Sequence, residues 1–320
     1  MARTRHPTRR DVLKTAAALP AILAIRPRGA AAAGVDLPPL PEIASADATL
    51  LRPGDAGYAK YDVAHNIRTR LDPALRALCR TPAGVAQMVD WVRENDLPFA
   101  VRCGGHSYEG FSQSASVVID VRPMAAARVD RAARVLTIGA GASLGAAYQA
   151  VARQGLAFAA GSCPTVGISG HTLGGGYGLL ARPLGLTADN LLGLTLVDAH
   201  GRMVEVDAAR EPDLFWACRG GGGGSFGIAT EFRFKLHPVT RVVTFKASWT
   251  LPLAAARDLF RAWQAWLPTV PAAMTPALNI ASVAPGRFAM RCVGQSLGSE
   301  REVGAAIGRR ARAASGAGVT

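Results

Sequence analysis

The residues best suited to carry chemistry lie in two loops that are rich in glycine. The first loop is Arg102–Gly110, with the sequence RCGGHSYEG. Two adjacent glycines followed by a serine offer consecutive backbone N–H groups that can surround a phosphate, and Arg102 can add positive charge. Taken alone, His106 would be an ordinary hydrogen-bonding histidine of a loop. This segment therefore predicts an anion-binding site.

The second loop is Gly161–Gly178, with the sequence GSCPTVGISGHTLGGGYG. Its density of glycine argues against a regular helix or strand, and it lets backbone pack flat against a large planar ligand. The later run Gly220–Gly224 offers a third place of close approach. Taken alone, Cys163 would be a buried, unreactive thiol. The glycine pattern predicts a site for a large flat ligand.

A further glycine motif competes for the role of nucleotide-binding site. Gly139–Gly145 (GAGASLG) follows a predicted strand and approximates a dinucleotide-binding turn. Its spacing differs from that fingerprint by one residue, and no Asp or Glu follows about 20 residues later. We interpret it as a strand-to-helix turn, so a nicotinamide-dependent dehydrogenase is the least favoured function.

The chain has five cysteines, and none of them forms a CxxC pair or a zinc-type spacing. No metal site is predicted. In an oxidising compartment, an odd number leaves at least one thiol unpaired or joined to another partner. The sequence leaves open whether Cys79 and Cys103 form a disulfide.

Hydrophobic patterning predicts short strands that alternate with helices, which is typical of an α+β fold. Thr81 is expected to cap a helix over 84–94, and another helix is expected over 143–154. After Pro238 the composition changes, and a helix over 254–267 is expected between two strands. Residues 35–57 are rich in proline and are expected to be irregular. The predicted strands are 78–80, 99–102, 117–120, 135–138, 194–197, 203–206, 228–236, 242–250 and 278–283.

From about Asn66 to Pro238, the motifs resemble those of FAD-linked oxidases of the vanillyl-alcohol oxidase superfamily. They are most similar to the berberine-bridge-enzyme-like (oligosaccharide-oxidase-like) group. The resemblance rests on the two loops, on GLTADN at 185–190 and on FWACRGGG at 215–222. It implies an α+β fold: a two-subdomain PCMH-type FAD-binding domain followed by the start of an α+β substrate domain, truncated at its C-terminus.

In that family, a histidine of the first loop bonds the flavin 8α-methyl group and a cysteine of the second loop bonds flavin C6. The matching residues are His106 and Cys163, so the resemblance implies a bicovalent FAD. Two such bonds are expected to fix the ring, raise its redox potential and leave its substrate face open. Val166 matches a position where valine goes with access of oxygen. His171 is interpreted as a structural hydrogen-bonding residue or, less favoured, as a polar group near the substrate.

Position in the motifs implies further contacts with FAD. The segment 102–107 matches the pyrophosphate contacts, with Cys103 itself interpreted as a core residue, and Ile228 matches a backbone position that holds the adenine. The expected cofactor-binding residues are Arg102, Cys103, Gly104, Gly105, His106, Ser107, Cys163, Val166, Gly167, Gly170, His171, Gly174, Gly175, Gly176, Tyr177, Gly178 and Ile228.

The resemblance implies an FAD-dependent oxidase that acts on the CH–OH group of an alcohol or sugar-type substrate. Hydride passes to the flavin while a base takes the hydroxyl proton, and O2 then reoxidises the flavin to give H2O2. The expected partners are a small-molecule substrate and O2. In the family the base comes from later sequence, so no catalytic residue is assigned here. The alternative is a truncated, non-catalytic flavin-binding remnant.

Four parts are expected along the chain. Residues 1–33 resemble a twin-arginine signal peptide, with Arg9-Arg10 ahead of an apolar stretch and small residues before Gly34. Residues 34–65 are a linker with the first elements of the FAD domain, 66–240 are the PCMH-type FAD-binding domain, and 241–320 are an incomplete substrate domain. This organisation predicts transit through the twin-arginine export machinery to the periplasm or the exterior.

The formal net charge of +13 raises nucleic acid and membranes as partners. After residue 33, however, the arginines are dispersed, with no basic run interleaved with aromatic residues, so no nucleic-acid partner is expected. No later run of about 18 apolar residues is present, so no stable membrane anchor is expected.

Overall fold

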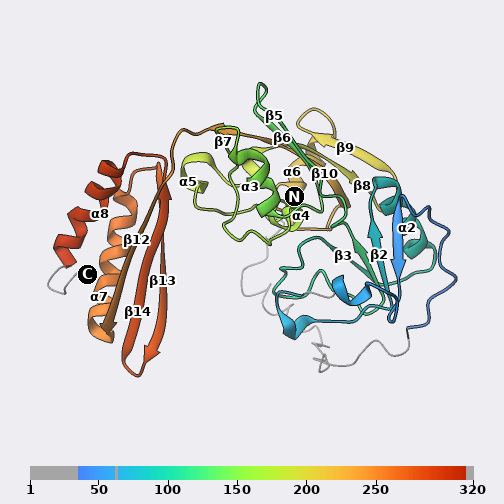
Figure 1. The fold of residues 1–320 in the computed structure, drawn as a ribbon, viewed down its shortest axis with the longest axis horizontal. Coiled ribbons are helices and arrows are strands. Elements are labelled where there is room, and N and C mark those ends of the chain that lie inside the picture. The colour runs from blue at the N-terminus through green and yellow to red at the C-terminus, as the bar shows by residue number, and fades with distance from the viewer. Residues whose placement is uncertain (1–34, 62–63, 315–320) are drawn as a thin grey trace, which may run out of the picture. The chain divides into compact units, whose positions relative to one another are not determined.

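The computed structural model describes residues 35–61 and 64–314. The predicted signal peptide lies outside these residues. Within them, no helix is both long and apolar enough to cross a membrane. Helices and β-sheets are both well represented, which confirms the predicted α+β fold class (Figure 1).

The first sheet has the strand order β1-β2-β4-β3. Strand β1 (Ala48–Leu51) runs antiparallel to β2 (Leu75–Cys79), while β2, β4 (Val117–Asp120) and β3 (Phe99–Arg102) are parallel. Every residue of β2 and β4 is buried, as expected for parallel strands covered on both faces. The expectation of an irregular segment over 35–57 was wrong at β1, because pairing with β2 holds this short strand in place.

Helix α2 (Pro82–Glu94) connects β2 to β3 and begins as the sequence predicts. The Thr81 hydroxyl oxygen accepts a hydrogen bond from the Gly84 N–H at 3.1 Å, and Pro82 stands at a position where no backbone donor is needed. Its buried face, which includes Val85 and Met88, joins the main hydrophobic core.

The second sheet has the strand order β5-β6-β10-β8-β9, and all neighbours are antiparallel. Phe232 and Phe234 of its central strand are fully buried and stack on each other. One core cluster contains residues of both the first and the second sheet. The strands are β5 (Ala127–Asp130), β6 (Val135–Gly139), β10 (Ile228–Lys235), β8 (Leu191–Val197) and β9 (Met203–Asp207).

Short elements join these strands. Helix α3 (Leu144–Ala152) is capped by Ser143, whose hydroxyl accepts from the Ala146 N–H. Strand β7 (Leu156–Ala157) pairs with β11 (His237–Pro238). The remaining elements are α4 (Ile168–Leu173), α5 (Ala181–Leu184), α6 (Pro212–Cys218) and the 3-10 turns η1 (Tyr58–Tyr61), η2 (Ile67–Thr69) and η3 (Ala188–Asn190).

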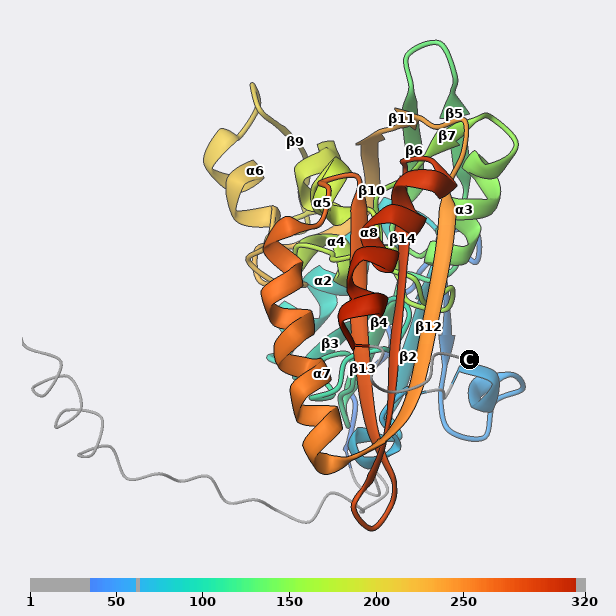
Figure 2. The same cartoon turned by 90° about the vertical axis from the view of Figure 1, so that its left-hand side faces the viewer.

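The last segment forms a sheet of order β12-β14-β13 with two helices, α7 and α8, against one of its faces (Figure 2). Alternate residues of β12 point into a separate small core that contains Trp266 and Cys292. The sequence predicted β12, α7 and β13, and it missed β14. The elements are β12 (Val243–Pro252), α7 (Leu253–Trp266), η4 (Leu267–Thr269), β13 (Met274–Ala284), β14 (Arg287–Ser296) and α8 (Glu300–Ala314).

Candidate cofactor-binding site

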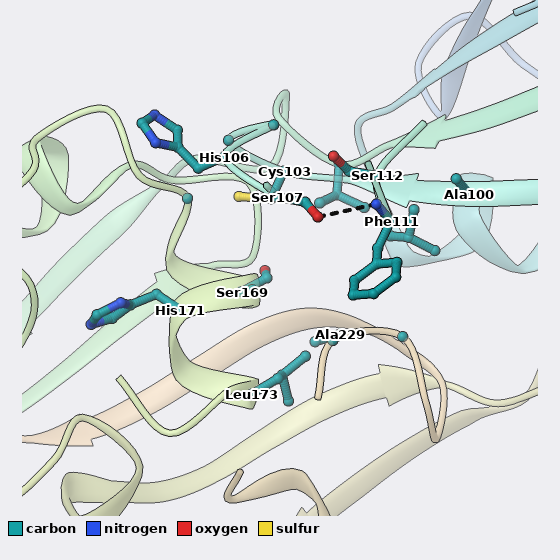
Figure 3. A pocket seen from close by; sticks show the side chains of 18 of the residues that line it. Ala100, Cys103, His106, Ser107, Phe111, Ser112, Ser169, His171, Leu173 and Ala229 are labelled. Carbon is teal, nitrogen blue, oxygen red and sulfur yellow. Dashed lines mark hydrogen bonds between the residues drawn. The ribbon is translucent and has the colours of Figure 1, made fainter. Parts of the chain in front are cut away.

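A cavity of about 620 Å³ lies where three loops meet. Its walls come from β3 and the loop after it, from the segment around α4, and from the glycine-rich run that leads into β10. Figure 3 shows side chains of the first wall opposite those of α4 and the start of β10. The volume lies in the range of small-molecule and cofactor sites.

Close backbone contact between two glycines joins the first two walls. A Cβ placed on Gly104 would lie 2.3 Å from the Gly167 nitrogen, and a Cβ on Gly167 would lie 2.3 Å from the Gly104 nitrogen. Only glycine permits this approach at both positions. In contrast, a Cβ on Gly170 or Gly224 would meet nothing within 4 Å, and both residues line the cavity. The glycines therefore have two different roles: some let the backbones of two loops pack closely, and others leave space for a ligand.

The loop after β3 is fixed at both of its ends. Arg102, the last residue of β3, is fully buried and is not among the residues that line the cavity. The Ser107 hydroxyl accepts a hydrogen bond from the Phe111 N–H at 3.0 Å (Figure 3). Between these points Gly105 has a φ of 68°, which glycine adopts without strain. The turn places His106 at the edge of the cavity.

His106 and Cys163 both contact the hydroxyl of Thr165. The Nε2 of His106 lies 3.0 Å from the Thr165 Oγ1, and the Sγ of Cys163 lies 3.5 Å from the same oxygen. The ring of His65 stacks on the ring of His106, with 4.4 Å between centroids. Two residues that are 57 positions apart in the sequence thus lie on either side of one hydroxyl.

The surroundings of these two side chains favour their nucleophilic forms. Burial, and next the nearby His65, lower the pKa of His106 below its ordinary value. The hydrogen bond from the Thr165 hydroxyl, and next the backbone N–H of Thr165, lower the pKa of the Cys163 thiol. A neutral imidazole and a thiolate are the reactive forms of these residues.

His171 contributes to the structure of the second loop and also lines the cavity. Its Nε2 accepts a hydrogen bond from the Gly161 N–H at 3.0 Å and lies 3.1 Å from the Thr187 hydroxyl oxygen. Burial lowers the pKa of His171. Because Nε2 accepts from a backbone N–H, the ring is neutral in this arrangement.

The expected cofactor-binding residues divide into two groups. Ten of them line the cavity: Cys103, Gly104, Gly105, His106, Ser107, Val166, Gly167, Gly170, His171 and Ile228. Outside the lining lie Arg102, Cys163, Gly174, Gly175, Gly176, Tyr177 and Gly178. Of these, Cys163 is linked through the Thr165 hydroxyl to His106, which lines the cavity. A Cβ on Gly178 would clash with the Ala160 carbonyl oxygen, which shows a packing role.

The second loop is more regular than the sequence indicated. Residues 168–173 form the short helix α4, although the density of glycine argued against a regular element. Gly170 lies inside this helix, and Gly167 and Gly174 stand at its two ends. The glycines serve at the ends of the helix and at its exposed side, so they do not prevent the helix from forming.

Sequence reasoning missed several residues of the cavity. In the third wall, Gly223 and Gly224 belong to the run that the sequence indicated as a place of close approach, whereas Gly227 and Ala229 were missed. The exposed aromatic residues Tyr108 and Phe111 of the first wall were missed as well. Thr165, which contacts both His106 and Cys163, was also missed. The signal available for Thr165 was its place between Cys163 and Val166 in one motif.

The turn at Gly139–Gly145, which was the competing candidate for a nucleotide-binding site, packs closely against other backbone of the protein. A Cβ on Gly139 would lie 2.2 Å from the Met124 carbonyl oxygen, and a Cβ on Gly141 would lie 1.9 Å from the Val121 carbonyl oxygen. None of the residues of this turn lines the cavity. The structure therefore agrees with the interpretation of a strand-to-helix turn.

Comparison with known proteins identifies the family to which this chain belongs. Residues 73–207 match a family model described as an FAD binding domain. The structure of a BBE-like 1 protein from Physcomitrella patens has a TM-score of 0.76 and 34% sequence identity, covering 82% of this chain and 57% of that one. The chain belongs to the berberine bridge enzyme-like FAD-linked oxidoreductases. This membership confirms the resemblance inferred from the motifs.

Some relatives of this berberine bridge enzyme-like chain are bacterial. The Bacillus subtilis protein named uncharacterized FAD-linked oxidoreductase YvdP is 38% identical over 220 residues, which are 68% of this chain and 49% of that protein. The structure of 6-hydroxy-D-nicotine oxidase from Arthrobacter nicotinovorans has a TM-score of 0.78 and 28% identity, covering 82% of this chain and 58% of that one. The chain spans about half the length of the curated relatives that it matches.

Proposed function

We propose that this FAD-binding oxidoreductase holds its FAD in the cavity by two covalent bonds, at His106 and at Cys163. We further propose that the flavin takes a hydride from the CH–OH group of a small alcohol or sugar-type substrate and is reoxidised by O2. The observation that carries the proposal is the placement of the imidazole and the thiol on either side of the Thr165 hydroxyl.

The residues of the cavity fit an FAD. The glycines at 170 and 224 leave open space beside a wall of exposed backbone, which suits a flat ring system. The Gly104-Gly105 turn presents backbone to an anionic group. Because Thr165 occupies Nε2 of His106, Nδ1 is the ring nitrogen that remains for a covalent bond. When bound, the flavin would supply the hydride acceptor and the place where O2 is reduced.

Residues of the chain have separate roles in this proposal. Val166 lines the cavity, where the family resemblance associates valine with access of O2. His171 holds the second loop in place through the Gly161 N–H and is not assigned as the catalytic base, since its Nε2 already accepts that bond. No catalytic base is assigned. A chain that binds flavin without turning over substrate is the competing outcome.

The test is to express the full chain with FAD and to run it on a denaturing gel. We expect flavin fluorescence to stay with the protein band, and peptide mapping to place flavin on His106 and Cys163. Substrate oxidation is then followed as H2O2 release from a panel of alcohols and sugars. Flavin that is wholly removed by acid precipitation would refute covalent attachment. Bound flavin that no member of the panel reduces would favour the non-catalytic outcome.

We also propose that the chain is exported to the periplasm or the exterior through the twin-arginine machinery, and that it binds neither nucleic acid nor a membrane stably. The support for export is the sequence of residues 1–33, and the support for the second statement is that the later arginines are dispersed and no later run of about 18 apolar residues is present. Replacing Arg9 and Arg10 together with lysine should abolish export, measured by fractionating cells that make the full chain. Export that is unchanged by this replacement would contradict the twin-arginine route.

A further inference from the structure

We propose that Thr165 is a positioning residue whose single hydroxyl orients both His106 and Cys163 for attachment of the flavin. This inference rests on the proposed covalent binding of FAD. It adds a third residue to the attachment site, one that forms no bond to the cofactor. The evidence for this role is that the Thr165 Oγ1 lies 3.0 Å from the His106 Nε2 and 3.5 Å from the Cys163 Sγ.

The backbone around Thr165 is held firmly, so its hydroxyl has a defined place. The Val166 carbonyl oxygen accepts from the Leu144 N–H and the Pro164 carbonyl oxygen accepts from the Gly145 N–H, both at 2.9 Å. These two donors belong to the first turn of α3. A tight turn also joins the Val166 N–H to the Cys163 carbonyl oxygen at 3.3 Å. Thr165 therefore lies between two anchored neighbours.

The His106 ring is restrained from two directions. Thr165 contacts its Nε2, and His65 stacks on its face with 18° between the ring planes. The backbone of His65 is itself tied to the same loop, because its N–H donates to the Gly105 carbonyl oxygen at 3.1 Å. With the ring held in this way, Nδ1 is the ring nitrogen that Thr165 does not engage.

One hydroxyl can serve both nucleophiles because it donates one hydrogen bond and accepts others. If His106 donates from Nε2 to Thr165, Nδ1 carries a lone pair. Thr165 can then donate to Cys163, which stabilises the thiolate. The same arrangement of protons therefore activates both residues, and reversing it would leave a protonated Nδ1 and a thiol.

Each attachment reaction balances with O2 as the oxidant. The new N–C or S–C bond replaces one hydrogen on the residue and one hydrogen on the flavin carbon that is attacked. The two protons and two electrons released are taken up by O2, which becomes H2O2. Thr165 is neither consumed nor changed, since it only accepts and donates hydrogen bonds.

The competing explanation is that Thr165 matters only for the turn between Cys163 and Val166. A purely structural role would be filled equally well by valine, which has the same shape and lacks the hydroxyl. A serine would keep the hydroxyl and lose a methyl group. Thr165→Val and Thr165→Ser therefore separate the hydroxyl from the shape.

The experiment uses the full chain purified from riboflavin-starved cells, incubated with FAD and air, and sampled by intact-mass spectrometry. Thr165→Val is made in three backgrounds: wild type, His106→Ala and Cys163→Ala. We expect attachment to be about tenfold slower in each, as for loss of one hydrogen bond, and Thr165→Ser to restore most of the rate. Thr240→Val, at an exposed position, is the matched control and should attach flavin at the wild-type rate.

A second readout needs no flavin. The alkylation of Cys163 by iodoacetamide is measured against pH, which is practical because the other four cysteines are buried. In Thr165→Val the midpoint should move to higher pH, and in Thr165→Ser it should stay near the wild-type value. If Thr165→Val does not yield folded protein, Thr165→Ala carries the same test.

Attachment by Thr165→Val at the wild-type rate, with an unchanged alkylation profile, would overturn the proposal. So would a Thr165→Ser variant that attaches flavin as slowly as Thr165→Val. Absence of covalent flavin from the wild-type chain is a different result: it would refute the proposed function rather than the role of Thr165 within it.

Discussion

The imidazole rings of His65 and His106 are stacked, with ring centroids 4.4 Å apart. Two imidazoles at this distance disfavour double protonation, because like charges repel. Burial is the larger cause of the lowered pKa of His106, and His65 adds to it. Both causes favour the neutral form of His106, and a neutral ring is the form that can act as a nucleophile.

Replacing His65 with phenylalanine should raise the pKa of His106 towards its ordinary value, because the stacked ring remains while the electrostatic effect of His65 on His106 is lost. NMR titration of the His106 ring measures this directly. At about pH 6, attachment at His106 should become about two- to threefold slower, since more of the ring is protonated. A pKa of His106 that stays the same or falls would contradict this account of the pair.

Cys163 should be the one rapidly alkylated thiol of the flavin-free chain. It is exposed, and the Thr165 hydroxyl lowers its pKa. Burial raises the pKa of the other four thiols, that of Cys79 to about 12. Peptide mapping after brief treatment with iodoacetamide at pH 8 should find about a hundredfold preference for Cys163. Equal labelling of Cys103 or Cys218 in the folded chain would show that the described burial is wrong.

Two glycine substitutions should separate folding from cofactor binding. Gly104→Ala places a Cβ 2.3 Å from the Gly167 nitrogen, so we expect it to destabilise the chain by about 1–3 kcal/mol. Gly170→Ala lies inside α4 with open space around it, so it should leave stability unchanged or raise it by up to about 1 kcal/mol. Its methyl group would nevertheless enter the cavity and weaken FAD binding.

Urea unfolding and the amount of FAD retained measure these two effects separately. If Gly170→Ala bound FAD as tightly as the wild type, the cavity would not be the flavin site. If Gly104→Ala were as stable as the wild type, the loops would be less tightly joined than described.

Acid should destabilise the fold partly through His171. Burial lowers the pKa of its ring in the folded chain below the ordinary value of 6.5, and its Nε2 accepts from the Gly161 N–H. Above pH 6.5 the ring is neutral in both states and contributes no pH dependence. As the pH falls below 6.5, the unfolded chain takes up a proton first, so the free energy of unfolding decreases.

Urea unfolding of the flavin-free chain between pH 5 and pH 8 tests this sign. His171→Gln can still accept the Gly161 N–H but does not titrate, so its stability should fall less steeply with acid. His106 and His237, whose pKa values are also lowered, remain in both proteins and provide the common background. A steeper acid dependence in His171→Gln would contradict the assignment.

Local sequence signals predicted the elements that depend on local chemistry. Helix α2 begins at the Thr81 cap as expected, and β3 and β4 have the predicted bounds. Strand β1 and helix α4 escaped prediction because each is stabilised by distant contacts: β1 by pairing with β2, and α4 by packing against the two loops around it.

In the candidate site too, local motifs were predicted from the sequence and long-range contacts were not. The loops with His106 and Cys163 were identified from their motifs, because glycine density and residue type are visible in the sequence. The role of Thr165 was not, because it depends on a contact between residues 59 positions apart. The run Gly220–Gly224 was also noticed in the sequence, but Gly227 and Ala229 join the third wall only because this run folds against α4, where the Gly222 N–H donates to the Leu173 carbonyl oxygen.

The most direct test of the central claim is the mass of the intact chain after acid denaturation. We predict that the wild-type protein carries one covalently bound FAD, that His106→Ala and Cys163→Ala each keep one bond and stay fluorescent on a denaturing gel, and that the double variant releases all of its FAD. A wild-type chain with the unmodified mass, or a double variant that still carries covalent flavin, would contradict the account.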